Sequence, residues 1–207
     1  MLKIWGRRNS SNVQKVMWTV GELGLAHERV DIGGEFGGNN KPAYLALNPN
    51  GLVPTIEDGD LILWESNSIV RYLAGRYGPG KLEPKNAKAR ALASQWMDWQ
   101  ISVVLPALSP AFWGLVRTPL EKRDHAAIAA SQAKTTDAMK ILDANLSRNV
   151  YVAGNAFSMG DISVGVFTYR FRQLVPERPP LTNLERWYAS LEQRPAFRDH
   201  VAAVPLT

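Results

Sequence analysis

The chain has 207 residues, of which 45% are hydrophobic and 21% charged, and a formal net charge of +5, a composition typical of a soluble globular protein. It contains no cysteine, which excludes disulfides, thiolate metal sites and a cysteine nucleophile, and its three histidines are too far apart for a metal site. The basic residues are scattered and no run of about 18 apolar residues occurs, so we expect no nucleic-acid partner, no membrane span and a cytoplasmic location.

The first part of the chain predicts a strand, a helix and a second strand. Residues 2–5 have the pattern of a strand, residues 13–23 have the apolar spacing of a helix, and residues 27–32 again resemble a strand. Elements of these lengths form a βαβ unit, so the two strands should pair in parallel. A loop rich in Gly and Asn follows over residues 33–40, and Pro42 then begins a short helix.

Two more strands and a helix complete this half of the chain. Residues 53–57 and 61–64 predict strands joined by a hairpin turn at Asp58-Gly59, and residues 66–76 predict a helix. The element order predicts a layered α/β domain over residues 1–78.

The composition changes after Tyr77, where prolines and glycines indicate a linker at residues 79–85. The remaining residues, 86–207, predict an all-helical domain. We expect helices from Asn86 to about Pro106, from a capping box at Thr118 to about Leu146, from a capping box at Ser158, and from a capping box at Thr182 to about Arg194. In the Ser158 box, Asp161 should bond back to the Ser158 backbone, which gives Asp161 a structural role.

A proline stands at the start of the predicted third strand, where its missing N–H removes a hydrogen bond of the sheet. We predict a cis peptide bond between Val53 and Pro54. Such a bond turns the N–H and C=O of Val53 away from the sheet, where they can pair with an extended peptide as an additional strand would.

An acid and a hydroxyl, Glu65 and Ser66, open the helix that follows the fourth strand. A helix N-terminus attracts a carboxylate, to which Ser66 can donate a hydrogen bond, while Glu65 can accept one from an ammonium group. An α-amino acid end carries both charges, so it fits this pair of residues.

Together these features resemble the glutathione transferase superfamily over essentially the whole chain, through the turn Asn48–Pro54, the Glu65-Ser66 pair and the capping box at Ser158. The resemblance implies a thioredoxin-like α/β N-terminal domain followed by an all-α C-terminal domain, and a homodimer. It also implies glutathione as co-substrate, without a metal.

The resemblance also implies which residues hold each part of glutathione. Val53, with Pro54, would hold the cysteinyl part, and Glu65 and Ser66 the γ-glutamyl end. The candidates for the glycine carboxylate are Asn39, Asn40 and Lys41, although plant-type relatives commonly have histidine or lysine at the first two of these positions.

The catalytic group of this superfamily lies after the first strand, where this chain has neither tyrosine nor cysteine. Ser10 with Asn12 matches the Ser/Thr-x-Asn pattern of bacterial Nu-type enzymes, and the paired serines of zeta-like enzymes also support Ser10. Counted back from Lys15, Ser11 instead matches the serine of theta- and phi-like enzymes. We favour Ser10 with Asn12, and one of the two serines should cap the following helix.

The second substrate would bind between the domains, with Trp113 and Phe112 as the predicted walls of its pocket. The resemblance implies a detoxifying transferase that activates the glutathione thiolate by hydrogen bonding and attacks a hydrophobic electrophile. The alternatives are a glutathione-dependent disulfide reductase of the Nu type and a glutathione-binding protein without turnover.

Overall fold

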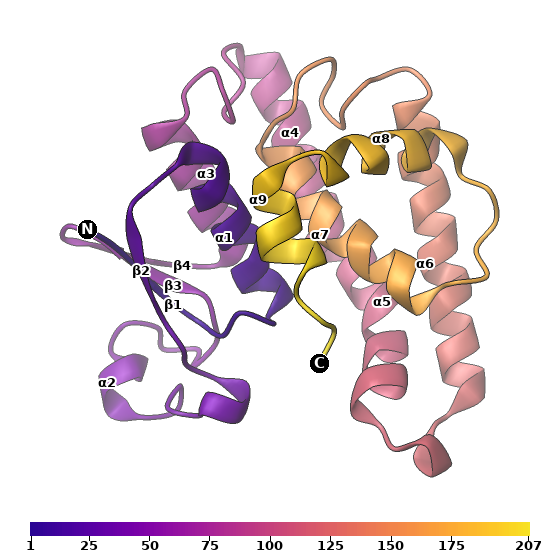
Figure 1. The fold of residues 1–207 in the computed structure, drawn as a ribbon, viewed down its shortest axis with the longest axis horizontal. Coiled ribbons are helices and arrows are strands. Elements are labelled where there is room, and N and C mark those ends of the chain that lie inside the picture. The colour runs from indigo at the N-terminus through magenta and orange to yellow at the C-terminus, as the bar shows by residue number, and fades with distance from the viewer.

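The computed structural model describes all 207 residues as an α/β domain beside a larger helical domain (Figure 1). The sheet has the order β2-β1-β3-β4, with β1 and β2 parallel and the other neighbours antiparallel. Its strands are β1 (Leu2–Trp5), β2 (His27–Val30), β3 (Thr55–Asp58) and β4 (Leu61–Trp64). This arrangement confirms the predicted βαβ unit and the thioredoxin-like N-terminal domain.

Three helices accompany the sheet: α1 (Ser11–Leu23), α2 (Pro42–Leu45) and α3 (Ser66–Tyr77). Helices α1 and α3 pack on one face of it, where Ile4, Ile56 and Ile69 are completely buried in a shared apolar cluster. Because these two helices fix the same face, their N-termini are held near the carboxyl end of β1 and the end of β4.

The strands of this domain differ from the prediction at their ends. β2 stops at Val30, before the chain turns at Gly33 with φ of 81°, and β3 starts only at Thr55. The hairpin turn is Gly59-Asp60, because Asp58 still pairs with Leu61. The Val53–Pro54 peptide bond is cis, as predicted, and it lies immediately before β3.

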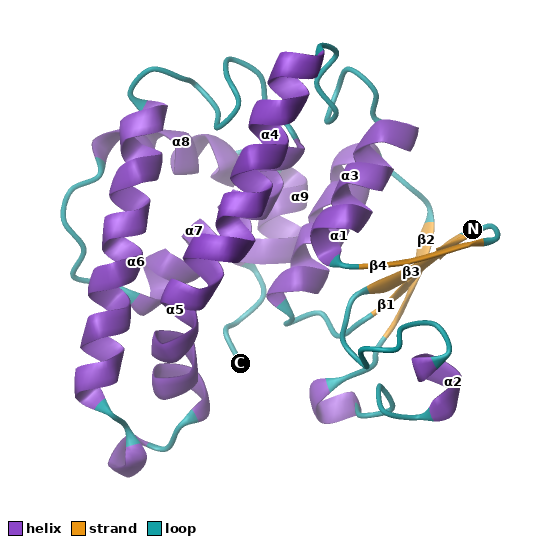
Figure 2. Ribbon diagram, turned by 180° about the vertical axis from the view of Figure 1, so that it is seen from behind, coloured by secondary structure: helices purple, strands orange, loops and turns teal.

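The second half of the chain is helical, as Figure 2 shows. Its α-helices are α4 (Ala87–Trp99), α5 (Leu105–Phe112), α6 (His125–Leu146), α7 (Met159–Leu174), α8 (Thr182–Glu192) and α9 (Pro195–Phe197). Wider π-helical turns occupy Gln100–Val104, Trp113–Arg117 and Arg198–Ala202, and 3₁₀ turns occupy Gly34–Phe36 and Leu120–Lys122. Helix α7 is the centre of this domain, because most of its residues are buried and it packs on α1, α4 and α5.

The helix that begins at Ala87 does not end near Pro106, contrary to the prediction. A π-helical turn precedes Pro106, and the helical run continues to Arg117. The altered hydrogen-bond pattern of such a turn accommodates a proline, which has no N–H to donate. By length and composition the run Ala87–Arg117 is apolar enough to cross a membrane, but here it packs against α6 and α7 within the helical domain.

Two predicted capping boxes are wrong. Thr118 has an extended backbone, and its hydroxyl donates to the Trp113 carbonyl at 3.0 Å, so it closes the preceding helix instead of opening α6. Helix α6 begins seven residues later, where the Asp124 side chain accepts from the Ala127 N–H at 2.9 Å.

The start of α8 is capped from another helix. The carboxylate of Asp143 in α6 accepts from the N–H of Asn183 at 2.9 Å and from that of Leu184 at 2.8 Å. Thr182 is already the first helical residue, and Glu185 pairs with Arg178. A tertiary contact therefore replaces the predicted local cap.

The capping box at Ser158 is confirmed, and it extends further than predicted. Asp161 is completely buried and accepts from the Ser158 N–H at 2.9 Å. It also accepts from the Val152 N–H at 3.0 Å and from the Trp187 indole at 2.9 Å. This carboxylate thus ties α7 to the preceding loop and to α8.

Candidate functional site

The loop before β3 contains Val53, which is half-buried. Its N–H and C=O make no hydrogen bond within the chain. The turn that precedes it is held by side chains: Asn48 and Tyr44 both donate to the Leu52 carbonyl, at 2.8 and 2.6 Å, and Asn39 donates to the Gly51 carbonyl at 2.7 Å. The turn is thereby fixed while the two polar groups of Val53 stay free to pair with an extended ligand.

The three candidates for the glycine carboxylate do not have equivalent surroundings. Asn39 uses its side-chain amide to hold the turn, whereas Asn40 and Lys41 are exposed. Lys41 immediately precedes α2, and its ammonium group is in no ion pair. Of the three, Lys41 therefore has a free positive charge to offer to an anion.

The start of α3 combines an exposed acid with a buried hydroxyl. Glu65 is the one residue other than glycine with a positive φ, 70°, and such strained conformations concentrate at functional sites. No side chain caps this helix, so its first N–H groups remain available to an anion. Ser66 is 2% exposed, and its hydroxyl donates to the Asn12 side chain at 3.1 Å. The structure therefore joins Asn12 and Ser66, two predicted site residues 54 positions apart.

The sequence did not reveal a buried lysine beneath this pair. Lys15 is completely buried, and its Nζ lies 2.6 Å from Gln100 Oε1, 3.2 Å from Asn67 Oδ1 and 3.4 Å from Ser66 Oγ. Burial lowers the pKa of Lys15 to about 7, although the nearby charge of Glu65 acts in the opposite direction. Because Gln100 belongs to the helical domain, this network connects the two domains directly beneath the start of α3.

We predict that Lys15 makes the stability of the protein depend on pH. Its folded pKa of about 7 lies below the ordinary lysine value of 10.5, so at a pH between those values the folded state has released a proton that the unfolded state keeps. The unfolding free energy of the parent protein should therefore rise relative to Lys15→Met, by about 2 kcal/mol from pH 7 to pH 9. Denaturant titrations at both pH values measure this difference.

The control is Lys140→Met, which removes an exposed lysine of α6. It should show no such pH dependence relative to the parent. A constant difference between the parent and Lys15→Met over this range would contradict a lowered pKa.

The two serines after β1 occupy different positions. Ser10 is the N-cap of α1, but its hydroxyl makes no capping hydrogen bond and stays available. Ser11 is the first helical residue and lines a cavity of about 170 Å³ between the domains. The other residues of this cavity come from the helical domain: Leu105, Leu108, Ser109, Phe112, Trp113, Phe167 and Arg170. The structure thus places Phe112 and Trp113 opposite the start of α1, and Trp113 is 62% exposed.

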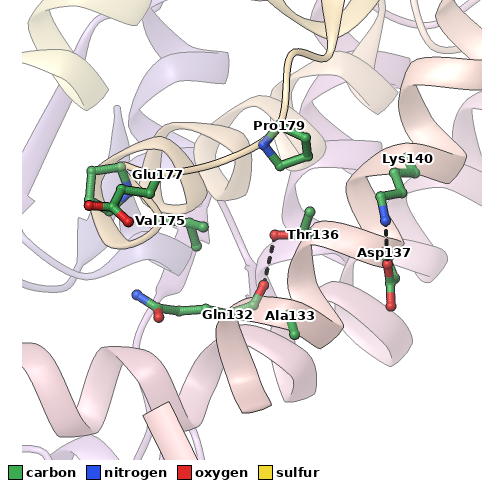
Figure 3. A pocket seen from close by; sticks show the side chains of 9 residues that line it. Gln132, Ala133, Thr136, Asp137, Lys140, Val175, Glu177 and Pro179 are labelled. Atoms are coloured by element: carbon green, nitrogen blue, oxygen red, sulfur yellow. Dashed lines mark hydrogen bonds and ion pairs between the residues drawn. The ribbon is translucent and has the colours of Figure 1, made fainter. Parts of the chain in front are cut away.

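A second cavity, of about 460 Å³, lies between α6 and the segment that follows α7 (Figure 3). Its walls include Gln132, Lys140 and Glu177, and none of the predicted site residues lines it. Lys140 is paired with Asp137 at 2.8 Å. No group of three or more His, Cys, Asp or Glu side chains could hold a metal ion.

Comparisons with known proteins agree with this arrangement. Residues 1–75 match the family described as glutathione S-transferase, N-terminal domain, and residues 126–203 match glutathione S-transferase, C-terminal domain. The chain belongs to the glutathione S-transferase family. It is 44% identical to glutathione S-transferase GstB of Escherichia coli, with both chains covered completely, and 32% identical to glutathione S-transferase 3 of Zea mays, over 99% of this chain and 95% of that one.

Solved structures place the transferase near a bacterial theta-class enzyme. The theta-class glutathione S-transferase of Xanthomonas axonopodis pv. citri, crystallised with glutathione bound, is 49% identical with a TM-score of 0.95, over 100% of this chain and 99% of that chain. The present chain is accordingly an enzyme of the glutathione transferase type, with a thioredoxin-like domain and a helical domain.

Sequence reasoning missed two buried cations of this transferase. Lys15 was used only to align Ser11 with the serine of theta- and phi-like enzymes, and no role was predicted for Arg170. The sequence contains only a weak indication of the buried Lys15, which interrupts the apolar face formed by Val13, Val16 and Met17. A charged residue on such a face indicates either a long side chain that reaches solvent or a buried polar network, and only packing decides between them.

Proposed function

We propose that this transferase binds glutathione at the domain boundary and conjugates its thiolate to an electrophile. The observation that carries the proposal is the unpaired backbone of Val53 beside the uncapped start of α3. The cysteinyl part of glutathione would pair with Val53, its γ-glutamyl end with Glu65 and Ser66, and its glycine carboxylate with Lys41. In support, the similar Xanthomonas enzyme was crystallised with glutathione bound. On this proposal residues 1–78 hold glutathione and residues 86–207 hold the second substrate.

Activation of the thiol would depend on Ser10. A free thiol has a pKa of about 8.5, so few molecules are thiolates at neutral pH. Lowering this pKa by two units requires about 2.7 kcal/mol of preferential stabilisation of the thiolate. A hydrogen bond from the free Ser10 hydroxyl, at about 1.5–3 kcal/mol, and the N-terminus of α1, at about 0.3–1 kcal/mol, together supply that amount. We propose an indirect role for Asn12, because its side-chain oxygen accepts a hydrogen bond from the Ser66 hydroxyl.

The second substrate would bind in the cavity beside Ser11, with Phe112 and Trp113 as its walls. Thiolate attack there needs no general base, because the proton leaves when the thiol ionises. No observation favours the disulfide-reductase alternative.

We also propose that the enzyme is a cytoplasmic homodimer with a role in detoxification. A groove between α4 and α6 is lined by Trp96, Trp99 and Ile141. Ile141 is 56% exposed, and contact with a second copy of the chain would cover it.

The experiment that tests the glutathione site is a calorimetric titration of glutathione into the parent protein and into Ser66→Ala. On this proposal the Ser66 hydroxyl turns from Asn12 to the carboxylate of glutathione, and loss of this hydrogen bond to a charged group should weaken binding about 10- to 100-fold. Ser147→Ala, which removes an exposed hydroxyl at the end of α6, is the control and should bind like the parent. If the parent shows no binding at millimolar glutathione, the proposed site is wrong.

A further inference from the structure

An arginine without an acidic partner lies in the wall of the cavity beside Ser11. Arg170 is 6% exposed, and its one hydrogen bond within the chain goes from Nη2 to the Asn9 carbonyl at 3.1 Å. Its Nε is buried and has no hydrogen-bond partner, and Arg170 takes part in no ion pair. A buried cation left in this state is costly unless something of opposite charge pairs with it.

Two other arginines, Arg7 and Arg117, add positive charge to the surroundings of Arg170. Burial lowers the pKa of Arg170 to about 10, and the charges of Arg7 and Arg117 act in the same direction, whereas Tyr169 acts in the opposite one. Arg170 and Arg117 both lie over the ring of Phe112, at 5.1 and 5.8 Å from its centroid.

Apart from the Asn9 carbonyl, two oxygens near this group of arginines already accept hydrogen bonds from other residues. Glu35 accepts from the side chain of Asn9 at 3.3 Å, and the Thr207 carbonyl accepts from Arg117 at 2.6 Å. Neither is bonded to Arg170, whose positive charge therefore stays uncompensated at the cavity wall.

The cavity itself fits a small aromatic group. Its volume of about 170 Å³ is close to that of a cavity of about 150 Å³ that holds benzene. Phe112, Trp113 and Phe167 form apolar walls, and Arg170 is the one charged residue among them. An arginine in such a wall recognises a carboxylate through paired N–H groups.

From these observations we infer that the second substrate of the enzyme is a small electrophile that carries a carboxylate, which pairs with Arg170 while the thiolate attacks the reactive carbon. The inference rests on the proposed function and narrows its substrate class from hydrophobic electrophiles in general to anionic ones. For a chloroarene, the sulfur bonds to the ring carbon that bears chlorine, the carbon–chlorine bond breaks, and chloride leaves with its electron pair. The thiol proton has already passed to solvent, so no further reactant is needed.

A matched pair of probes tests this inference. 4-Chloro-3-nitrobenzoate carries a carboxylate where 1-chloro-2,4-dinitrobenzene carries a neutral nitro group. We expect Arg170→Met to lower kcat/KM for the benzoate about 10- to 100-fold more than it lowers kcat/KM for the neutral probe. Arg170→Lys, which keeps the charge but loses the paired N–H groups, should fall between the parent and Arg170→Met. Equal losses for both probes would overturn the inference, because Arg170 would then act on the reaction or the fold and not on the carboxylate.

A second measurement uses the parent protein and does not depend on a variant that folds. In the parent protein with glutathione present, benzoate should bind at least about tenfold more tightly than benzamide by calorimetry, and should compete with 1-chloro-2,4-dinitrobenzene. Equal binding of the two, or no binding of benzoate, overturns the inference. Absence of both glutathione binding and conjugation of the neutral probe would instead refute the proposed function, which separates the two failures.

Discussion

Replacing Ser10 by alanine should lower kcat/KM for conjugation of 1-chloro-2,4-dinitrobenzene at pH 6.5 by about 10- to 100-fold. The Ser10 hydroxyl stands at the N-terminus of α1 and makes no capping bond, so its hydrogen bond is available to the sulfur of glutathione. Loss of a hydrogen bond to a charged group costs about 1.5–3 kcal/mol, which converts to this range of rates. The same loss should raise the apparent pKa of the bound thiol by about one to two units. The pH dependence of kcat/KM and the thiolate absorbance of the binary complex measure this shift.

Ser11→Ala is the matched control for Ser10→Ala. Ser11 lines the cavity for the second substrate, so its replacement should raise KM for the electrophile and leave the pKa of the bound thiol unchanged. If Ser11→Ala raises the pKa of the thiol and Ser10→Ala does not, the two serines have the opposite roles. A rate loss in Ser10→Ala without any shift in thiol pKa would contradict activation by hydrogen bonding.

Features whose signals are local could be predicted from the sequence. The cis bond before Pro54 and the capping box of Ser158 with Asp161 involve residues at most a few positions apart, and both are present. The prediction of a local helix cap failed where a residue far along the chain caps the helix instead. Asp143 caps α8 from 40 positions away, so the local pattern at Thr182 was not needed as a cap.

The buried cations were missed for a related reason. Whether a basic side chain ends in solvent or in a network depends on elements far along the chain. Lys15 bonds to Gln100, 85 positions away, and Arg170 bonds to Asn9, 161 positions away. The prediction of a hydrophobic electrophile followed from the family resemblance, and Arg170 adds a positive charge to the cavity walls that were predicted as aromatic.

The largest stability effect is expected from Asp161→Ala. The carboxylate accepts three buried N–H groups, from Ser158, Val152 and the Trp187 indole, and alanine leaves all three without a partner. Buried donors without partners cost about 1–3 kcal/mol each, and the lost helix cap adds about 1 kcal/mol. Removing a desolvated carboxylate offsets part of this cost, so we expect a loss of about 4 kcal/mol in the free energy of unfolding, measured by denaturant titration.

The pH dependence of this loss distinguishes the cost of the three unpaired donors from the gain of removing a buried carboxylate. Burial raises the pKa of Asp161 from 3.8 to about 6, so between these values the folded state holds a proton that the unfolded state has released. The parent therefore loses stability as pH rises through this range, and the difference between parent and Asp161→Ala should shrink by about 1 kcal/mol from pH 5 to pH 7. Asp137→Ala, an exposed acid of α6, should change stability by less than about 0.5 kcal/mol at both pH values. A difference that instead grows with pH would mean that the three donors outweigh burial and hold the pKa of Asp161 below 3.8.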